Sequence, residues 1–239
     1  MKTTAVIIGG TSGVGLATAL RFSRAGAEVV IGGRDRRKLA AALEQLGAAG
    51  RGYVVDATSA PELNAFYEKA GAFTHLVLSL SGAKGAGTFA GLDLEELRQG
   101  FEAKYWAQVM AAQAALPYLA EDGSLTFVTA VSAQMANPGT AGLAAINGAL
   151  ERMIPVLAVE LAPLRVNGVS PGVVDTPWWG WLPAEQRQAS FAQYSRQAPL
   201  GRVGEPNDLA AAIYALATNR FVTGQVLAVD GGLRLKAGG

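Results

Sequence analysis

The chain has 239 residues, of which 50% are hydrophobic and 16% are charged, and its formal net charge at pH 7 is +1. This composition suits an α/β domain with a large core, and it shows neither the basic stripe of a nucleic-acid-binding protein nor an acidic disordered tail. With no cysteine and one histidine, the sequence excludes a disulfide framework, a thiolate nucleophile and a zinc site, so no metal is expected.

The first apolar run, residues 5–8, is too short for a signal peptide or a membrane span. We therefore expect a cytoplasmic protein that has neither a membrane nor a nucleic acid as its partner. No repeat or linker interrupts the sequence, so residues 1–239 are predicted to form a single domain.

Short apolar runs alternate with longer helical patterns along the chain, which indicates βαβ units around a parallel sheet. Strands are predicted at residues 5–8, 28–31, 52–55, 75–80, 124–129, 166–169 and 226–229. Helices are predicted near residues 13–25, 35–47, 60–70, 93–119, 140–162, 184–196 and 206–218. Apolar strands are typical of a sheet that helices cover on both faces. The prediction is a Rossmann-type α/β fold with a doubly wound parallel sheet of about seven strands, whose ligand lies at their carboxyl ends.

A glycine-rich segment follows the first predicted strand and opens the first predicted helix. Glycines permit a tight turn and let backbone N–H groups approach a pyrophosphate, which the positive end of the helix dipole attracts. A glycine-rich turn without any ligand is the alternative, but a position at the start of a βαβ unit favours phosphate binding. The residues expected to contact a dinucleotide here are Gly9, Thr11, Ser12, Gly13, Val14 and Gly15.

The end of the second predicted strand indicates which nicotinamide coenzyme binds. A carboxylate there would accept a hydrogen bond from the ribose 2′-hydroxyl of NAD, but Gly33 and Arg34 occupy this place. A guanidinium can pair with a 2′-phosphate, which favours NADP(H) over NAD(H), unless Arg34 merely begins a solvated helix. Asp35 is expected to cap that helix.

Two further strand ends carry candidate coenzyme contacts. Asp56 and Ala57 follow the third predicted strand, and Ser81 and Gly82 follow the fourth. Asp56 can accept a hydrogen bond from the adenine amino group, or it can cap the next helix, a role that Ser59 could also fill. The single histidine, His75, begins the fourth strand at the opposite edge of the sheet and is expected to be structural.

Together with segments further along the chain, these residues resemble the short-chain dehydrogenase/reductase family over essentially the whole sequence. The resemblance rests on the pattern Gly9-x-x-x-Gly13-x-Gly15 and on residues 165–176, 199–206 and 223–232. It implies an oxidoreductase that acts on a carbonyl or alcohol, and assembly as a homodimer or homotetramer. It also implies that the nicotinamide end of the coenzyme meets Pro171, Gly172, Val174 and Thr176.

The resemblance places the catalytic Ser, Tyr, Lys and Asn of the family at positions where this chain has other residues. The Ser and Tyr positions hold Ala130 and Leu143, and the Lys and Asn positions hold Asn147 and Lys104. Leucine has no proton to give, and loss of a positioned general acid typically costs about 10²–10⁴ in rate. The usual mechanism of the family therefore cannot be carried over.

The lysine and the asparagine have exchanged positions, which suggests a substituted site. Our hypothesis is that Lys104 reaches the nicotinamide ribose or a substrate oxygen, with Asn147 as its partner, so that an ammonium stabilises a developing oxyanion. Alternatively, Lys104 packs its stem between helices and sends its charge to Glu102, Glu151 or water. Ser132, two residues after Ala130, is a further candidate catalytic hydroxyl.

Three tryptophans, Trp178, Trp179 and Trp181, lie in the region that covers the substrate in the family. Large rings suit an apolar or aromatic small-molecule substrate, or burial against a neighbouring subunit. The sequence favours an NADP(H)-dependent oxidoreductase with a substituted active site. It leaves open an NADP(H)-binding sensor or oligomer partner without turnover, and a lyase or isomerase that uses Lys104 as its base.

Overall fold

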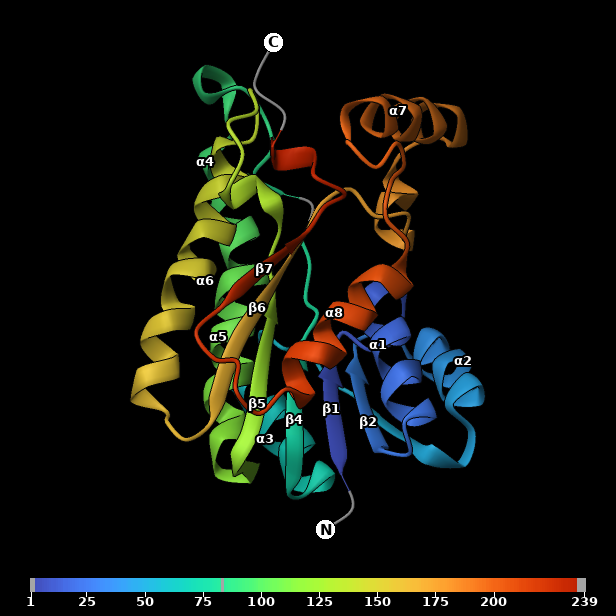
Figure 1. Cartoon of the computed structure of the whole chain (residues 1–239), viewed down its shortest axis with the longest axis vertical. Helices are drawn as coiled ribbons and strands as arrows, with labels where there is room; N and C mark the ends of the chain where they lie inside the picture. Colours follow the sequence, from blue (N-terminus) through green and yellow to red (C-terminus); the bar gives the residue numbers. More distant parts are fainter. Residues whose placement is uncertain (1–2, 83, 236–239) are drawn as a thin grey trace.

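The computed structural model describes residues 3–82 and 84–235, so the ends of the predicted domain 1–239 and Ala83 lie outside the described residues. A parallel sheet forms its centre, with seven strands in the order β3-β2-β1-β4-β5-β6-β7 (Figure 1). The strands are β1 (Thr4–Ile8), β2 (Glu28–Gly33), β3 (Gly50–Val54), β4 (Phe73–Leu78), β5 (Leu119–Val128), β6 (Arg165–Pro171) and β7 (Val226–Val229). The order reverses at β1, as in a doubly wound Rossmann-type sheet, so the predicted fold class is confirmed.

Helices cover both faces of this sheet, as Figure 1 shows. One face carries α1 (Gly13–Arg24), α2 (Arg36–Leu46) and α8 (Pro206–Thr218). The other carries α3 (Ala60–Ala70), α5 (Ala107–Ala115) and α6 (Ala141–Glu160). By length and composition alone α6 could cross a membrane, a test that core helices of soluble proteins also pass.

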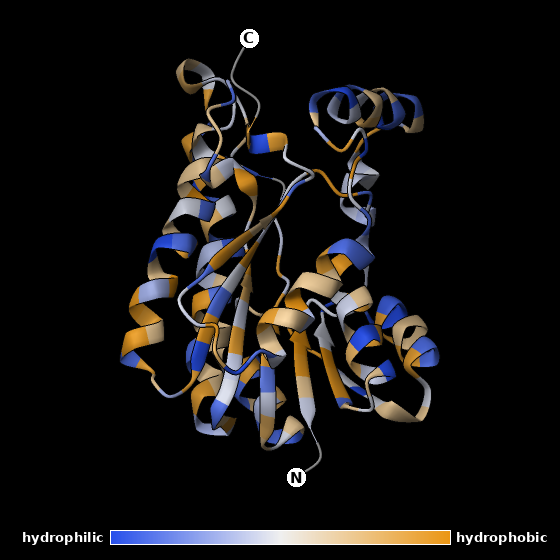
Figure 2. Ribbon diagram, in the orientation of Figure 1, coloured by the Kyte–Doolittle hydropathy of each residue, from blue (hydrophilic) through white to orange (hydrophobic). Residues whose placement is uncertain are grey.

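The central strand shows why the apolar runs predicted a sheet with two covered faces. All five residues of β1 are buried. Val6 and Ile8 join the core under α3, α5 and α6, whereas Ala5 and Ile7 join the core under α1, α2 and α8. Side chains of a strand alternate between the two faces, so an uninterrupted apolar strand needs cover on both. Figure 2 shows the same apolar character along the central strands.

The helix predicted at residues 93–119 is interrupted, and this part of the prediction is wrong in detail. α4 (Leu94–Gly100) runs into a π-helical segment, Phe101–Trp106, which leads into α5. The last turn, Leu116–Tyr118, is a 3₁₀ helix, and Leu119 already belongs to β5. Pro117 has no backbone N–H and ends the α-helical pattern there. The chain remains helical through this segment but forms i→i+5 hydrogen bonds, and the sequence did not reveal that change.

Gly15 lies where α1 leaves the loop that follows β1. A Cβ added there would stand 2.1 Å from the carbonyl oxygen of Gly9. No side chain fits in that space, so the close approach of α1 to the end of β1 depends on glycine.

We predict that Gly15→Ala lowers the free energy of unfolding by about 1–3 kcal/mol, because the added methyl group forces the helix away from the loop. Gly180→Ala is the matched control, since a Cβ at Gly180 would meet nothing within 4 Å. It should change stability by no more than about 0.5 kcal/mol. Urea unfolding monitored by circular dichroism measures both, and equal effects would contradict the packing role of Gly15.

Candidate functional site

Loops at the carboxyl ends of the strands enclose a cavity of about 700 Å³, within the range of small-molecule sites. It extends from the end of β2, across β1 and β4, to the ends of β5 and β6. The cavity therefore spans the point where the strand order reverses, where α/β proteins of this type bind their ligands.

The loop after β1 forms one wall of the cavity and presents backbone donors to it. Gly9 and Gly13 have φ angles of 82° and 52°, a left-handed conformation that favours glycine. α1 begins at Gly13, and the side chain of Ser12 does not cap it. In α2 and α3, by contrast, Asp35 and Ser59 accept hydrogen bonds from the first turn. The first N–H groups of α1 thus remain available to an anion at the positive end of the helix dipole.

One end of the cavity is lined by two exposed cations and a carboxylate: Arg34, Lys38 and Asp56. The pKa of Asp56 lies below its usual value, chiefly because the Thr58 backbone N–H donates to it at 2.9 Å. Burial opposes this effect, whereas the Thr58 hydroxyl at 2.8 Å and attraction to Arg34 lower the pKa further. Within the described residues, neither Arg34 nor Lys38 forms an ion pair. This end can hold an anionic group and also accept a hydrogen bond.

Most residues proposed from the sequence as coenzyme contacts line the same cavity. The exception is Gly15, whose place is between α1 and the preceding loop. Sequence reasoning also missed Lys38, although the basic run that begins at Arg34 was a signal for it. The proposed contacts that do line the cavity are Gly9, Thr11, Ser12, Gly13, Val14, Arg34, Asp56, Ala57, Ser81, Gly82, Pro171, Gly172, Val174 and Thr176.

The other end of the cavity brings together Lys104, Asn147 and Ser132, the three candidate catalytic residues. Lys104 is 8% exposed and comes from the π-helical segment, and its Nζ donates to the Thr129 carbonyl oxygen at 3.0 Å. Burial lowers the pKa of Lys104 from 10.5 to about 8, and attraction to Glu151 opposes part of that effect. A lysine with this proton affinity can act as an acid or a base near neutral pH.

Asn147 is not the hydrogen-bond partner of Lys104, which corrects that part of the sequence hypothesis. Its Nδ2 donates to Ser132 Oγ at 3.1 Å and to the Leu143 carbonyl oxygen at 2.9 Å. Its Oδ1 is buried and has no hydrogen-bond partner among the described residues. The Thr129 carbonyl accepts one of the three hydrogens of the Lys104 ammonium. The other two hydrogens and the Asn147 Oδ1 atom therefore remain available to a bound group.

Aromatic rings form another part of the cavity wall. Trp178 and Trp179 line it from the 3₁₀ segment Pro177–Trp181, together with Tyr194 of α7 (Ala184–Gln197). The two indole rings meet edge to face with centroids 4.9 Å apart, and Trp179 Nε1 donates to the Val174 carbonyl oxygen at 3.0 Å. Trp181 is 61% exposed and does not line the cavity. Two of the three tryptophans therefore form a wall for an apolar ligand.

His75 lies outside the cavity, in the buried core of the sheet. His75 is buried in β4, and its Nδ1 lies 2.8 Å from Ser124 Oγ. Burial lowers the pKa of His75 to about 4, so its ring stays neutral near pH 7. Among the described residues, no group of three or more His, Cys, Asp or Glu side chains could hold a metal ion.

Comparison with known proteins gives one consistent result. A family profile described as enoyl-(acyl carrier protein) reductase matches residues 9–234. The chain is 34% identical to an uncharacterized oxidoreductase of Mycobacterium tuberculosis, covering 96% of this chain and 91% of the relative. It is 30% identical to the 3-oxoacyl-[acyl-carrier-protein] reductase FabG of Thermotoga maritima, covering 95% and 96%. An NADPH-bound short-chain oxidoreductase of Pseudomonas aeruginosa with an atypical catalytic centre matches with a TM-score of 0.88 at 31% identity, covering 98% of each chain.

The buried Lys104 predicts a distinct pH dependence of stability. The folded state loses this proton near pH 8, whereas the unfolded chain holds it up to about 10.5, so the unfolded state binds more protons between these values. Stability therefore rises with pH in this window, by roughly 3 kcal/mol for this group alone.

Urea unfolding of the chain and of Lys104→Met at several pH values from 7 to 10.5 measures this contribution. All other titrating groups are common to both proteins, so the difference between the two curves isolates Lys104. The two free energies should diverge most at pH 7, where the variant gains the greatest relative stability. Parallel curves would mean that Lys104 keeps an ordinary proton affinity.

Proposed function

The chain belongs to the short-chain dehydrogenase/reductase family, and on that premise we propose that it is an NADP(H)-dependent oxidoreductase with a substituted active site. The observation that carries the proposal, among the described residues, is a single cavity that has an uncapped helix N-terminus and unpaired cations at one end and a buried lysine at the other. A dinucleotide that spans this cavity would bring its nicotinamide ring beside Lys104.

The choice of NADP(H) over NAD(H) rests on Arg34 and Lys38. Both cations line the cavity at the end of β2, where an NAD-binding protein would carry a carboxylate. A 2′-phosphate would find a guanidinium and an ammonium there, and Asp56 would accept a hydrogen bond from the adenine amino group. The bound NADPH of the P. aeruginosa neighbour is consistent with this choice.

The reaction we propose is hydride transfer between this coenzyme and a carbonyl or alcohol. The nicotinamide ring, when bound, supplies or accepts the hydride. During carbonyl reduction the substrate oxygen gains negative charge, which the Lys104 ammonium stabilises, and the same group then gives that oxygen its proton. Asn147 Oδ1 accepts a hydrogen bond from a hydroxyl group bound nearby, and Ser132 fixes the orientation of the amide. Lys104 thus replaces the tyrosine hydroxyl that Leu143 cannot supply.

The substrate we propose is a small molecule with an apolar or aromatic body. Trp178, Trp179 and Tyr194 would stack against it, and Leu143 and Met135 add apolar surface to the cavity. Closure of the segment Pro177–Trp181 over the substrate would exclude water from the reacting carbon.

We also propose that the protein assembles as a homodimer or homotetramer. Trp106, Val156 and Val159 are exposed on the segment before α5 and on α6, and Leu227 is exposed on the edge strand β7. Contiguous exposed apolar surface is typical of subunit interfaces, and Val156 and Val159 lie three residues apart on one side of α6.

A second candidate function is an NADP(H)-binding sensor or oligomer partner without turnover. Ala130 and Leu143, which place no hydroxyl at the two positions where the family has one, favour this alternative. A third, a lyase or isomerase, would use the neutral form of Lys104 as its base. All three share the coenzyme site, so the two experiments below separate coenzyme binding from chemistry.

We predict that Arg34→Ala weakens NADPH binding at least tenfold and leaves NADH binding nearly unchanged, because only NADPH carries the 2′-phosphate. Arg36→Ala is the matched control, since Arg36 is exposed on the same basic run but does not line the cavity. Isothermal titration calorimetry with both coenzymes measures the four affinities. Equal loss for NADH and NADPH, or binding of neither coenzyme by the unaltered chain, would refute the proposed coenzyme.

We predict that Lys104→Met lowers NADPH-dependent reduction of aromatic ketones and aldehydes by about 10²–10⁴-fold. In the unaltered protein kcat should fall as the pH rises through about 8, since only the ammonium gives a proton. Absorbance at 340 nm across a panel of carbonyl compounds measures turnover. Unchanged turnover in the variant would remove Lys104 from the mechanism, and tight NADPH binding without turnover on any compound would favour the sensor.

A further inference from the structure

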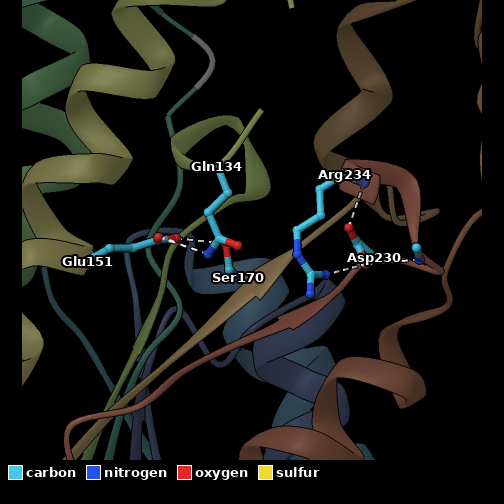
Figure 3. A network of polar contacts seen from close by, with 6 residues as sticks. Gln134, Glu151, Ser170, Asp230 and Arg234 are labelled. Carbon is cyan, nitrogen blue, oxygen red and sulfur yellow. Dashed lines mark hydrogen bonds and ion pairs between the residues drawn. The ribbon is translucent and has the colours of Figure 1, made fainter. Parts of the chain in front are cut away.

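A second polar cluster lies behind the wall of the cavity, centred on the carboxylate of Glu151. Figure 3 shows Glu151 of α6 pointing toward Ser170 and Gln134, which come from other parts of the fold. Its Oε1 accepts hydrogen bonds from Ser170 Oγ at 2.7 Å and Thr129 Oγ1 at 2.8 Å, and its Oε2 accepts one from Gln134 Nε2 at 2.9 Å. Three donors converge on one carboxyl group, and its two oxygens together accept all three hydrogen bonds.

Thr129 connects this cluster to the lysine. Its carbonyl oxygen accepts from Lys104 Nζ at 3.0 Å, and its hydroxyl donates to Glu151 at 2.8 Å. Thr129 is 3% exposed and Lys104 8% exposed, so water screens neither contact well. Lys104 and Thr129 line the cavity, whereas Glu151 does not. The carboxylate can therefore influence the reacting end without lining the cavity itself.

The other charged groups around Lys104 face solvent. Glu102 on the same segment is exposed, as are Glu95, Glu96 and Arg98 of α4 and Arg152 of α6. Glu95 and Arg98 pair with each other at 3.5 Å. Lys84, which also lines the cavity, is exposed as well and hydrogen-bonded to Gln99. Glu151 is thus the anion whose attraction offsets the burial of Lys104.

We propose that Glu151 is a positioning residue that keeps Lys104 protonated and fixes the ends of β5 and β6 beneath the reacting end of the cavity. The inference rests on the proposed role of Lys104 and extends it. A buried ammonium is destabilised by loss of hydration, and an anion fixed by three hydrogen bonds compensates without contacting the substrate. Thr129 and Ser170 come directly after Val128 of β5 and Val169 of β6, which pair with each other in the sheet. One carboxylate therefore holds the ends of two neighbouring strands.

Glu151→Gln tests the charge while it retains the shape of the side chain. The new amide oxygen can accept from Thr129 and Ser170, and the amide of Gln134 can rotate to accept from the new NH₂ group. Glu160→Gln is the matched control, because Glu160 is exposed near the end of the same helix. Glu151→Asp retains the charge on a side chain shorter by one methylene.

The readout is the titration midpoint of Lys104, followed by NMR in protein labelled with ¹³C at lysine Cε. The chain has only six lysines, and Lys104→Met identifies the resonance. We expect Glu151→Gln to lower the midpoint by roughly one pH unit, Glu151→Asp by less, and Glu160→Gln not at all. Where turnover is detected, the pH at which kcat falls should move down by the same amount, a shift that general loosening of the fold would not produce.

An unchanged or raised midpoint in Glu151→Gln would overturn the proposal. If that variant does not fold, as judged by circular dichroism, Glu151→Asp decides: a lowered midpoint supports the proposal and an unchanged one overturns it. NADPH binding by calorimetry keeps the two proposals separate. An unchanged midpoint with intact NADPH binding refutes only the role of Glu151, whereas a lowered midpoint in a chain that binds no NADPH refutes only the coenzyme.

Discussion

Parallel pairing of the seven strands is the constraint on which the rest of the structure depends. Because every strand runs in the same direction, all their carboxyl ends meet at one edge of the sheet. The loops after β1 and β2, the ends of β5 and β6, and the segment that carries the tryptophans all border one cavity there. The buried β1, covered on both faces, fixes this arrangement at the centre, where the strand order reverses.

Within that cavity the two ends follow different physical rules. At the end formed by β2, Arg34 and Lys38 are exposed and water screens their charges, so the proposed attraction of a phosphate depends on two cations that lie close together. At the end formed by β5 and β6, Lys104 is buried, and removal of water changes its proton affinity. In the proposals above, basic side chains thus bind the coenzyme at one end and carry out acid–base chemistry at the other.

The surrounding fold holds Lys104 and Asn147 in different ways. The π-helical segment carries Lys104 to the end of β5, where a backbone carbonyl meets its ammonium. Asn147 on α6 is held by Ser132 and by the carbonyl of Leu143, one turn before it on the same helix. Glu151, one turn further along α6, lies behind the cavity wall and interacts with the same strand end through Thr129. One helix therefore supplies both an amide that faces the cavity and a carboxylate that lies behind the cavity wall.

The sequence by itself determined the sheet, the glycine turn after β1, the basic strand end at Arg34 and the capping role of Asp35. These features are local: they depend on the alternation of side chains along a strand, on backbone freedom at glycine and on hydrogen bonds between near neighbours. Only the tertiary structure decided that Thr129, rather than Asn147, binds Lys104, and that Glu151 joins the ends of β5 and β6. These partners lie 19 to 25 residues apart in the chain. Their meeting depends on how α6 and the π-helical segment pack against the sheet, and no local pattern records that packing.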